Sequence, residues 1–169
     1  KLNNLKQAAK TMNFLTEHGI SSYGELESKL TAISARRDTA HAEIKRIESR
    51  SAELALVMKH AGTYRQLKPL YDRYRKSNDK EKFLRGHESE IILFEAAARE
   101  LKRLGAVPLP TTESMKTELA NLNAEKERLL AEYKAARTEA QEYDTVKQNV
   151  DALLAVPKEQ EQQRRHELE

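Results

Sequence analysis

Apolar residues recur at alternating spacings of four and three along two long stretches of the chain. The repeating positions are Leu26, Leu30, Ile33, Arg37, Ala40, Ile44, Ile47, Ser51, Leu54 and Met58 in the first stretch, and Met115, Leu119, Leu122, Lys126, Leu129, Tyr133, Ala136, Ala140, Tyr143, Lys147, Val150 and Leu154 in the second. A period of three and a half residues is typical of helices that wind around each other. The pattern therefore predicts two long helices that pair along one seam.

An antiparallel arrangement brings the two stretches together if Met58 lies near Met115, which also places Ile33 near Ala140. A slip of one heptad would keep the same apolar seam, so this register is a hypothesis. The seam is interrupted by Arg37, Ser51, Lys126 and Lys147. Buried polar residues can select one register, or the long side chains can extend past a flat seam into solvent.

Glycine, proline and capping residues divide the chain into helices. The expected helices cover residues 2–18, 23–60, 64–76, 80–104 and 112–155. A capping box of Ser22 and Glu25 starts the first long helix, and Gly62 is expected to end it. Pro69 is expected to follow a short turn and sit at the start of the next helix. Pro157 is expected to end the last helix, with a polar, frayed tail after it.

Two of the shorter helices carry their own apolar pattern. The opening helix places Leu2, Leu5, Ala9, Met12 and Leu15 along one face and is expected to stop at Gly19. Asp79 is expected to cap the helix over residues 80–104. The second half of that helix is apolar nearly all round, which predicts burial between neighbours.

These elements predict an all-α fold: a long antiparallel coiled-coil arm with a small helical insert at its tip and a short N-terminal helix. The expected segments are an N-terminal helix (1–19), a first coiled-coil helix (20–62), a basic two-helix insert (63–106), a second coiled-coil helix (107–156) and a polar tail (157–169).

Charge is unevenly distributed along this chain, in which 34% of the residues are charged and 5% are aromatic. Residues 59–85 contain nine Lys and Arg against three acids, whereas the remainder contains 21 basic and 24 acidic residues. The absence of cysteine excludes disulfides and thiolate metal sites. No apolar run approaches the roughly 20 residues of a membrane span, so we expect no membrane insertion and a cytoplasmic location.

The segment from Tyr64 to Arg85 mixes tyrosines with cations, a combination that can pair with phosphates and stack on bases. The candidate nucleic-acid-binding residues are Arg65, Lys68, Tyr71, Arg73, Tyr74, Arg75, Lys76, Lys80, Lys82 and Arg85. The competing interpretation is an ordinary amphipathic helix, with Tyr71 and Tyr74 in the core and the cations in solvent.

Catalytic chemistry has little support in the sequence. The five histidines form no local metal-binding motif, and no phosphate-binding glycine loop or nucleophile elbow is present. Carboxylate pairs on exposed helices normally serve solvation. We therefore expect no catalytic residue, no metal and no cofactor, and we expect that the chain is not an enzyme.

Several segments resemble the C-terminal helical region of relaxase (mobilization) proteins from conjugative transposons of Gram-positive bacteria. They are NFLTEHGI, YRQLKPLYDRYRKS, FLRGHESEIILFEAAARELKRLG and a final helix that ends in VDALL, and they cover most of residues 1–156. In that family an N-terminal nuclease nicks DNA, and none of its catalytic motifs occurs here. The resemblance implies a non-catalytic accessory role in the bacterial cytoplasm, with DNA, conjugation-machinery proteins or a second copy of the chain as partners. The alternative is a structural coiled-coil spacer or a protein-interaction or oligomerisation arm.

Overall fold

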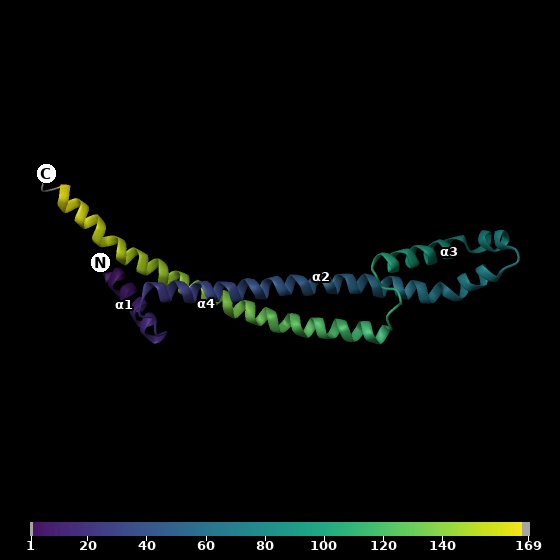
Figure 1. The fold of residues 1–169 in the computed structure, drawn as a ribbon, viewed down its shortest axis with the longest axis horizontal. Coiled ribbons are helices and arrows are strands. Elements are labelled where there is room, and N and C mark those ends of the chain that lie inside the picture. Colours follow the sequence, from purple (N-terminus) through teal and green to yellow (C-terminus); the bar gives the residue numbers. More distant parts are fainter. Residues whose placement is uncertain (1, 167–169) are drawn as a thin grey trace. The chain divides into compact units, whose positions relative to one another are not determined.

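The computed structural model describes the backbone of residues 2–166 and the side chains of residues 4–155. Four helices account for nearly all of the described backbone, and it contains no strand (Figure 1). They are α1 (Leu2–Glu17), α2 (Tyr23–Lys76), α3 (Lys80–Arg103) and α4 (Thr112–His166). The predicted all-α class is confirmed.

The chain folds as two compact units, and each long helix contributes to both. Unit 1 comprises Lys1–Glu43 and Arg128–Glu169, and unit 2 comprises Ile44–Glu127. Unit 1 therefore contains α1 with the first part of α2 and the last part of α4. Unit 2 contains the rest of α2, all of α3 and the start of α4.

In unit 1, α2 and α4 pack antiparallel along the predicted seam. Leu26, Ile33, Ala140, Tyr143 and Val146 are buried there in one cluster with Ile20. Across the seam Arg36 forms an ion pair with Glu139, and the rings of His41 and Tyr133 lie 5.6 Å apart. These pairs lie within two residues of the proposed register.

Helix α1 packs on α4, and it does so partly through residues outside the predicted apolar face. Phe14 meets Tyr143 edge to face at 5.0 Å, and Thr11, which is buried, accepts a hydrogen bond from Asn149. Leu5 and Met12 are instead 71% and 60% exposed, so the predicted apolar face is only partly used. The hydrogen bond gives the buried Thr11 hydroxyl a partner and so removes most of the free-energy cost of burying it.

In unit 2, α2 and α4 also run antiparallel. Glu48 pairs with Lys126 at 2.9 Å, and Arg50 pairs with Glu118 at 2.7 Å. A buried cluster joins α2 to the end of α3, the α3–α4 connection and the start of α4: Leu54, Val57, Ala61, Leu101, Ala106 and Met115. The Glu48–Lys126 contact lies within one residue of the proposed register.

The predicted end of the first long helix at Gly62 is wrong, because α2 continues to Lys76 through both Gly62 and Pro69. Ala61 is fully buried, and Tyr64 packs against the same cluster, so side chains on both sides of Gly62 hold the helix in place. A helix-interior proline costs about 3 kcal/mol, yet packing against α3 on either side keeps the helix intact here. Tertiary contacts therefore outweigh the tendency of Gly62 and Pro69 to interrupt the helix.

Helix α3 begins and ends as predicted but is less buried than predicted. Asp79 accepts a hydrogen bond from the backbone N–H of Lys82 at its start, and Gly105 takes a positive φ of 66° after its end. One stripe is buried: Ile91, Phe94, Ala97 and Leu101. Ile92 and Leu93 are 54% and 55% exposed, because α3 packs through that single stripe.

The starts of the two long helices are capped by hydroxyl side chains. Ser22 accepts from the backbone N–H of Glu25, as the capping box predicts, while the Glu25 carboxylate accepts from the backbone and hydroxyl of Ser21. Thr111 caps α4 by accepting from the N–H of Ser114. The predicted cap at Ser22 is confirmed, with the return bond of the capping box moved to Ser21.

The end of α4 differs from the prediction. The helix runs through Pro157 to His166, so Pro157 does not terminate it. A proline removes one backbone hydrogen bond and can kink a helix without ending it. The last predicted seam position, Leu154, is exposed, so the seam stops before it.

Candidate nucleic-acid interface

Figure 1 shows the turn that joins α2 to α3 in unit 2. Six exposed cations lie on either side of this turn in the sequence. We call them the tip cations: Arg73, Arg75 and Lys76 at the end of α2, and Lys80, Lys82 and Arg85 at the start of α3. The only acids in residues 73–85 are Asp79 and Glu81. The turn therefore carries an excess of four positive charges within 13 residues.

The tip cations have no charge partner in the described part of the chain. None of their side chains forms an ion pair or a hydrogen bond there. Some other cations of unit 2 are paired, for example Arg50 with Glu118 and Lys126 with Glu48. The six charges around the turn are thus free to attract an external anion.

The turn itself is held by short-range hydrogen bonds. The Ser77 hydroxyl donates to the carbonyl of Asp79 at 3.1 Å and accepts from its N–H at 3.2 Å. The Asp79 carboxylate accepts from the N–H of Lys82 at 3.0 Å, and its carbonyl accepts from the N–H of Phe83. The two helix ends are therefore fixed to one another across three residues.

The charges at the start of α3 oppose the helix dipole. A helix N-terminus carries a partial positive charge, so Lys80 and Lys82 in the first turn each cost about 0.3–1 kcal/mol. Glu81 is the only acid in that turn. Arg73, Arg75 and Lys76 are favourably placed, because they lie in the last turn of α2. A bound anion would offset the unfavourable charge at the start of α3.

Two of the predicted binding residues have structural partners instead. Arg65 donates to the carbonyl of Pro110 and to the hydroxyl of Thr112 at 2.8 Å, which ties α2 to the start of α4. Lys68 lies 3.0 Å from the carboxylate of Asp72, and that hydrogen bond raises the pKa of Lys68. Arg65 and Lys68 therefore differ from the tip cations, because each has a partner within the protein.

The predicted tyrosines pack between the helices of the hairpin. Tyr71 stacks on Phe94 with ring centroids 4.2 Å apart, and its hydroxyl reaches Glu95 at 3.5 Å. Tyr74 lies against Tyr71 at 5.9 Å and against Phe83 at 6.2 Å. The core interpretation of Tyr71 and Tyr74 is the one that these contacts support.

Sequence reasoning missed Ser77, whose hydroxyl holds the turn. The signal was present, because Ser and Asn between a basic helix end and the capping Asp79 are typical turn residues. It also missed Phe94 as the ring against which Tyr64 and Tyr71 both stack. No local pattern reveals that contact, since Phe94 is more than 20 residues away from either tyrosine.

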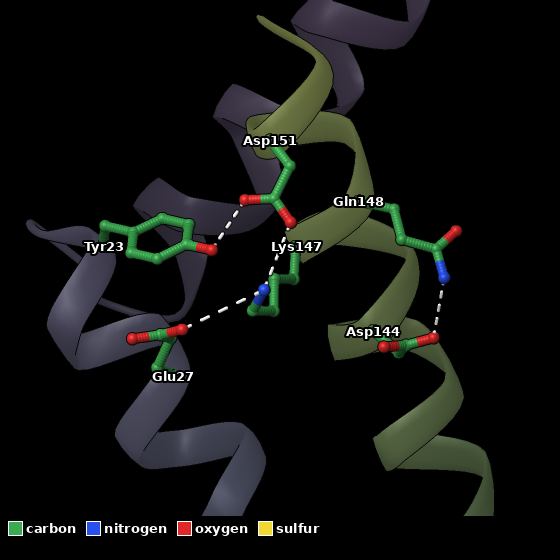
Figure 2. Close-up of polar contacts among 6 residues, drawn as sticks. All are labelled: Tyr23, Glu27, Asp144, Lys147, Gln148 and Asp151. Atoms are coloured by element: carbon green, nitrogen blue, oxygen red, sulfur yellow. Dashed lines mark hydrogen bonds and ion pairs between the residues drawn. The ribbon is translucent and has the colours of Figure 1, made fainter. Parts of the chain in front are cut away.

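A separate polar network fastens α2 to α4 in unit 1 (Figure 2). Tyr23 donates its phenol proton to Asp151 at 2.6 Å, and Lys147 lies 3.1 Å from Asp151 and 3.9 Å from Glu27. Hydrogen bonds from Tyr23 and Lys147 lower the pKa of Asp151, while contacts with Tyr23 and Asp151 raise the pKa of Lys147. Each charged group in the network has a partner of opposite sign, since Lys147 lies between the two carboxylates, and this supports a structural role.

A groove of about 580 Å³ lies beside the seam in unit 1, lined by Arg37, His41, Tyr133 and Arg137 among others. Arg37 already pairs with Asp38, which lies on the same wall. The mixed charges single out no ligand chemistry. Among the residues that the structure describes, no three His, Asp or Glu side chains are grouped so that they could hold a metal ion.

Within the described residues, no helix is both long and apolar enough to cross a membrane. No family model, curated protein or solved structure matches the chain.

Proposed function

We propose that the hairpin of α2 and α3 binds DNA through the tip cations, and that the chain is a non-catalytic accessory part of a conjugative relaxase. In this proposal the paired α2 and α4 form a coiled-coil arm that carries the hairpin. The observation that supports DNA binding is the set of six exposed, unpaired cations around one hydrogen-bonded turn. The link to relaxases rests on the resemblance of the sequence alone.

Phosphate is the anion that fits this arrangement. Binding of Lys and Arg to the phosphates of a nucleic acid releases condensed counterions, and this release supplies most of the affinity of sequence-independent binding. The tip cations need no rearrangement to be available, because none has an internal partner to give up in the described structure. The hydrogen bonds of Ser77 and Asp79 also order the turn before any ligand binds, so binding does not have to order it.

The direct test measures binding of a fluorescently labelled 20-base-pair DNA to the whole chain at 50 mM salt. The variant Arg73→Glu, Arg75→Glu, Lys76→Glu is expected to bind about a hundredfold more weakly, because three phosphate contacts become repulsive. A matched control reverses three exposed cations outside the turn that also lack a side-chain partner: Lys59, Lys116 and Lys134. The control is expected to stay within about fivefold of the wild type.

Two outcomes of this test count against the proposal. One is the absence of DNA binding by the wild type at 50 mM salt, and the other is an equal loss of affinity in both triple variants. Vesicles of acidic phospholipid serve as a second polyanion, and tighter binding to them than to DNA would assign the turn to a membrane surface instead. Circular dichroism establishes that each variant retains its helices.

The second candidate function is protein interaction, and the exposed apolar residues of α3 favour it. Ile92 and Leu93 project from α3 away from its buried stripe. A second copy of the chain can cover them, as expected of an oligomerisation arm. This candidate predicts that sedimentation equilibrium detects a dimer, and that the substitution Leu93→Lys dissociates it. If the wild type is still a monomer at 100 times the concentration used for DNA binding, self-association through this face is excluded.

A further inference from the structure

The aromatic rings of the hairpin form a series of contacts between its helices, and two of these contacts are stacked. Phe94 lies between Tyr64 and Tyr71, with ring centroids 4.8 Å and 4.2 Å away, both stacked. The series continues from Tyr71 to Tyr74, then to Phe83 and to His87. Each ring therefore already has at least one aromatic neighbour within the protein.

This arrangement separates the two kinds of side chain that the sequence mixes. The tyrosines and Phe83 are partly buried, and Phe94 is buried, whereas all six tip cations are exposed. Proteins that bind single strands stack successive bases on aromatic rings, and each base contributes about 1–3 kcal/mol. Here the rings pack α3 against α2, so base stacking is not expected to contribute to the binding of a single strand.

The tip cations fall into two clusters on neighbouring helices. One lies in the last turn of α2 and the other in the first two turns of α3. Axes of packed helices lie about 8–10 Å apart, and the major groove of B-form DNA is about 12 Å wide. The two dimensions are of similar size, which is the condition for each cluster to contact the phosphates of a different strand.

We propose that the ligand of the hairpin is double-stranded, B-form DNA, gripped through the phosphates of both strands without readout of its bases. This inference rests on the proposed function and names the form of nucleic acid that the same site takes. Double-stranded RNA fits less well, because its major groove is deep and narrow. A single strand offers phosphates along one backbone only, and the hairpin has no free ring to hold its bases.

The experiment compares four kinds of ligand on the full chain at one salt concentration: a DNA duplex, each of its separated strands, an unrelated duplex of equal length and the RNA duplex of the same sequence. We expect the two DNA duplexes to bind within about threefold of each other and at least about tenfold more tightly than the strands or the RNA duplex. A strand that binds as tightly as the duplex overturns the inference and leaves the proposed function standing. Absence of binding to all four ligands defeats the proposed function itself.

A variant gives an independent readout. Tyr74→Leu removes a ring near the turn while keeping an apolar side chain of similar volume in the hairpin. If Tyr74 stacked on a base, strand binding would weaken by about 5- to 150-fold; we expect duplex and strand affinities both within about twofold of the wild type. Tyrosine fluorescence, which the chain offers without interference from tryptophan, is expected to remain unquenched by the strand. A strong quench that Tyr74→Leu abolishes would contradict the inference.

Discussion

The ring of Tyr71 stacks on the ring of Phe94 at a centroid distance of 4.2 Å, and this contact joins α2 to α3 across the hairpin. Phe94 also stacks on Tyr64, which lies seven residues before Tyr71 on α2. The contacts lie on both sides of Pro69, the residue that would otherwise be expected to break the helix. One buried phenylalanine thus stabilises the hairpin and keeps α2 continuous into the turn that carries the tip cations.

Replacing Phe94 with Ala is expected to destabilise the protein by about 3–5 kcal/mol, because it leaves a cavity between two tyrosines. The measurement is the free energy of unfolding from urea denaturation followed by circular dichroism. Ile92→Ala is the matched control on the exposed side of the same helix, and its effect is expected to stay within about 0.5 kcal/mol. Equal effects of the two substitutions would show that α3 does not pack through Phe94.

Arg65 is expected to matter for stability and not for DNA affinity. Arg65→Lys loses the forked pair of bonds to Pro110 and Thr112, which is expected to cost about 1–2 kcal/mol. The charge is retained, so DNA affinity of the folded variant is expected to stay within about twofold of the wild type. A large loss of DNA affinity with unchanged stability would place Arg65 among the phosphate contacts.

Gly62 and Gly105 are expected to respond in opposite ways to alanine. Gly62 is exposed within α2, and a Cβ there would meet nothing within 4 Å, so Gly62→Ala is expected to stabilise the protein by about 0.5–1 kcal/mol. Gly105 has a positive φ, so Gly105→Ala is expected to destabilise it by about 1–2 kcal/mol. The measurement is thermal unfolding of both variants. If α2 ended at Gly62, Gly62→Ala would also lower the melting temperature.

Stability is expected to fall in mild acid. The backbone N–H of Ser21 lowers the pKa of Glu25, Lys126 lowers that of Glu48, and Tyr23 with Lys147 lowers that of Asp151. A carboxylate with a lowered pKa in the folded state contributes its stability above its unfolded pKa, and the contribution is lost as the pH falls through the folded value. The loss therefore begins near the ordinary Glu pKa of 4.5. Urea midpoints from pH 7 to pH 2.5 measure it, and Tyr23→Phe is expected to flatten the curve.

The seam was predictable from sequence because it depends on a local repeat. Ile33, Ala40, Ile47 and Leu54 recur at every seventh residue, and all four are buried. The continuation of α2 was not predictable, since the burial of Ala61 depends on cluster members that are distant in sequence, such as Leu101. The contact of α1 with α4 was not predictable for the same reason, because Asn149 is the partner that allows Thr11 to be buried.

The candidate site was predictable as a group of residues but not as an arrangement. Composition singles out the cations near the turn because charge excess is visible in sequence. It cannot separate Arg65 from Arg73, since the partners of Arg65 lie at residues 110 and 112. Nor can it tell that Tyr71 faces Phe94 rather than solvent.

The most direct test of the central claim is the dependence of duplex affinity on salt. If all six tip cations pair with phosphates, the plot of log K against log salt has a slope of about −5. The triple variant Arg73→Glu, Arg75→Glu, Lys76→Glu is expected to reduce the magnitude of that slope by about half, while Lys59→Glu, Lys116→Glu, Lys134→Glu leaves it unchanged. A wild-type slope near zero, or a slope that the first variant does not alter, would contradict the account.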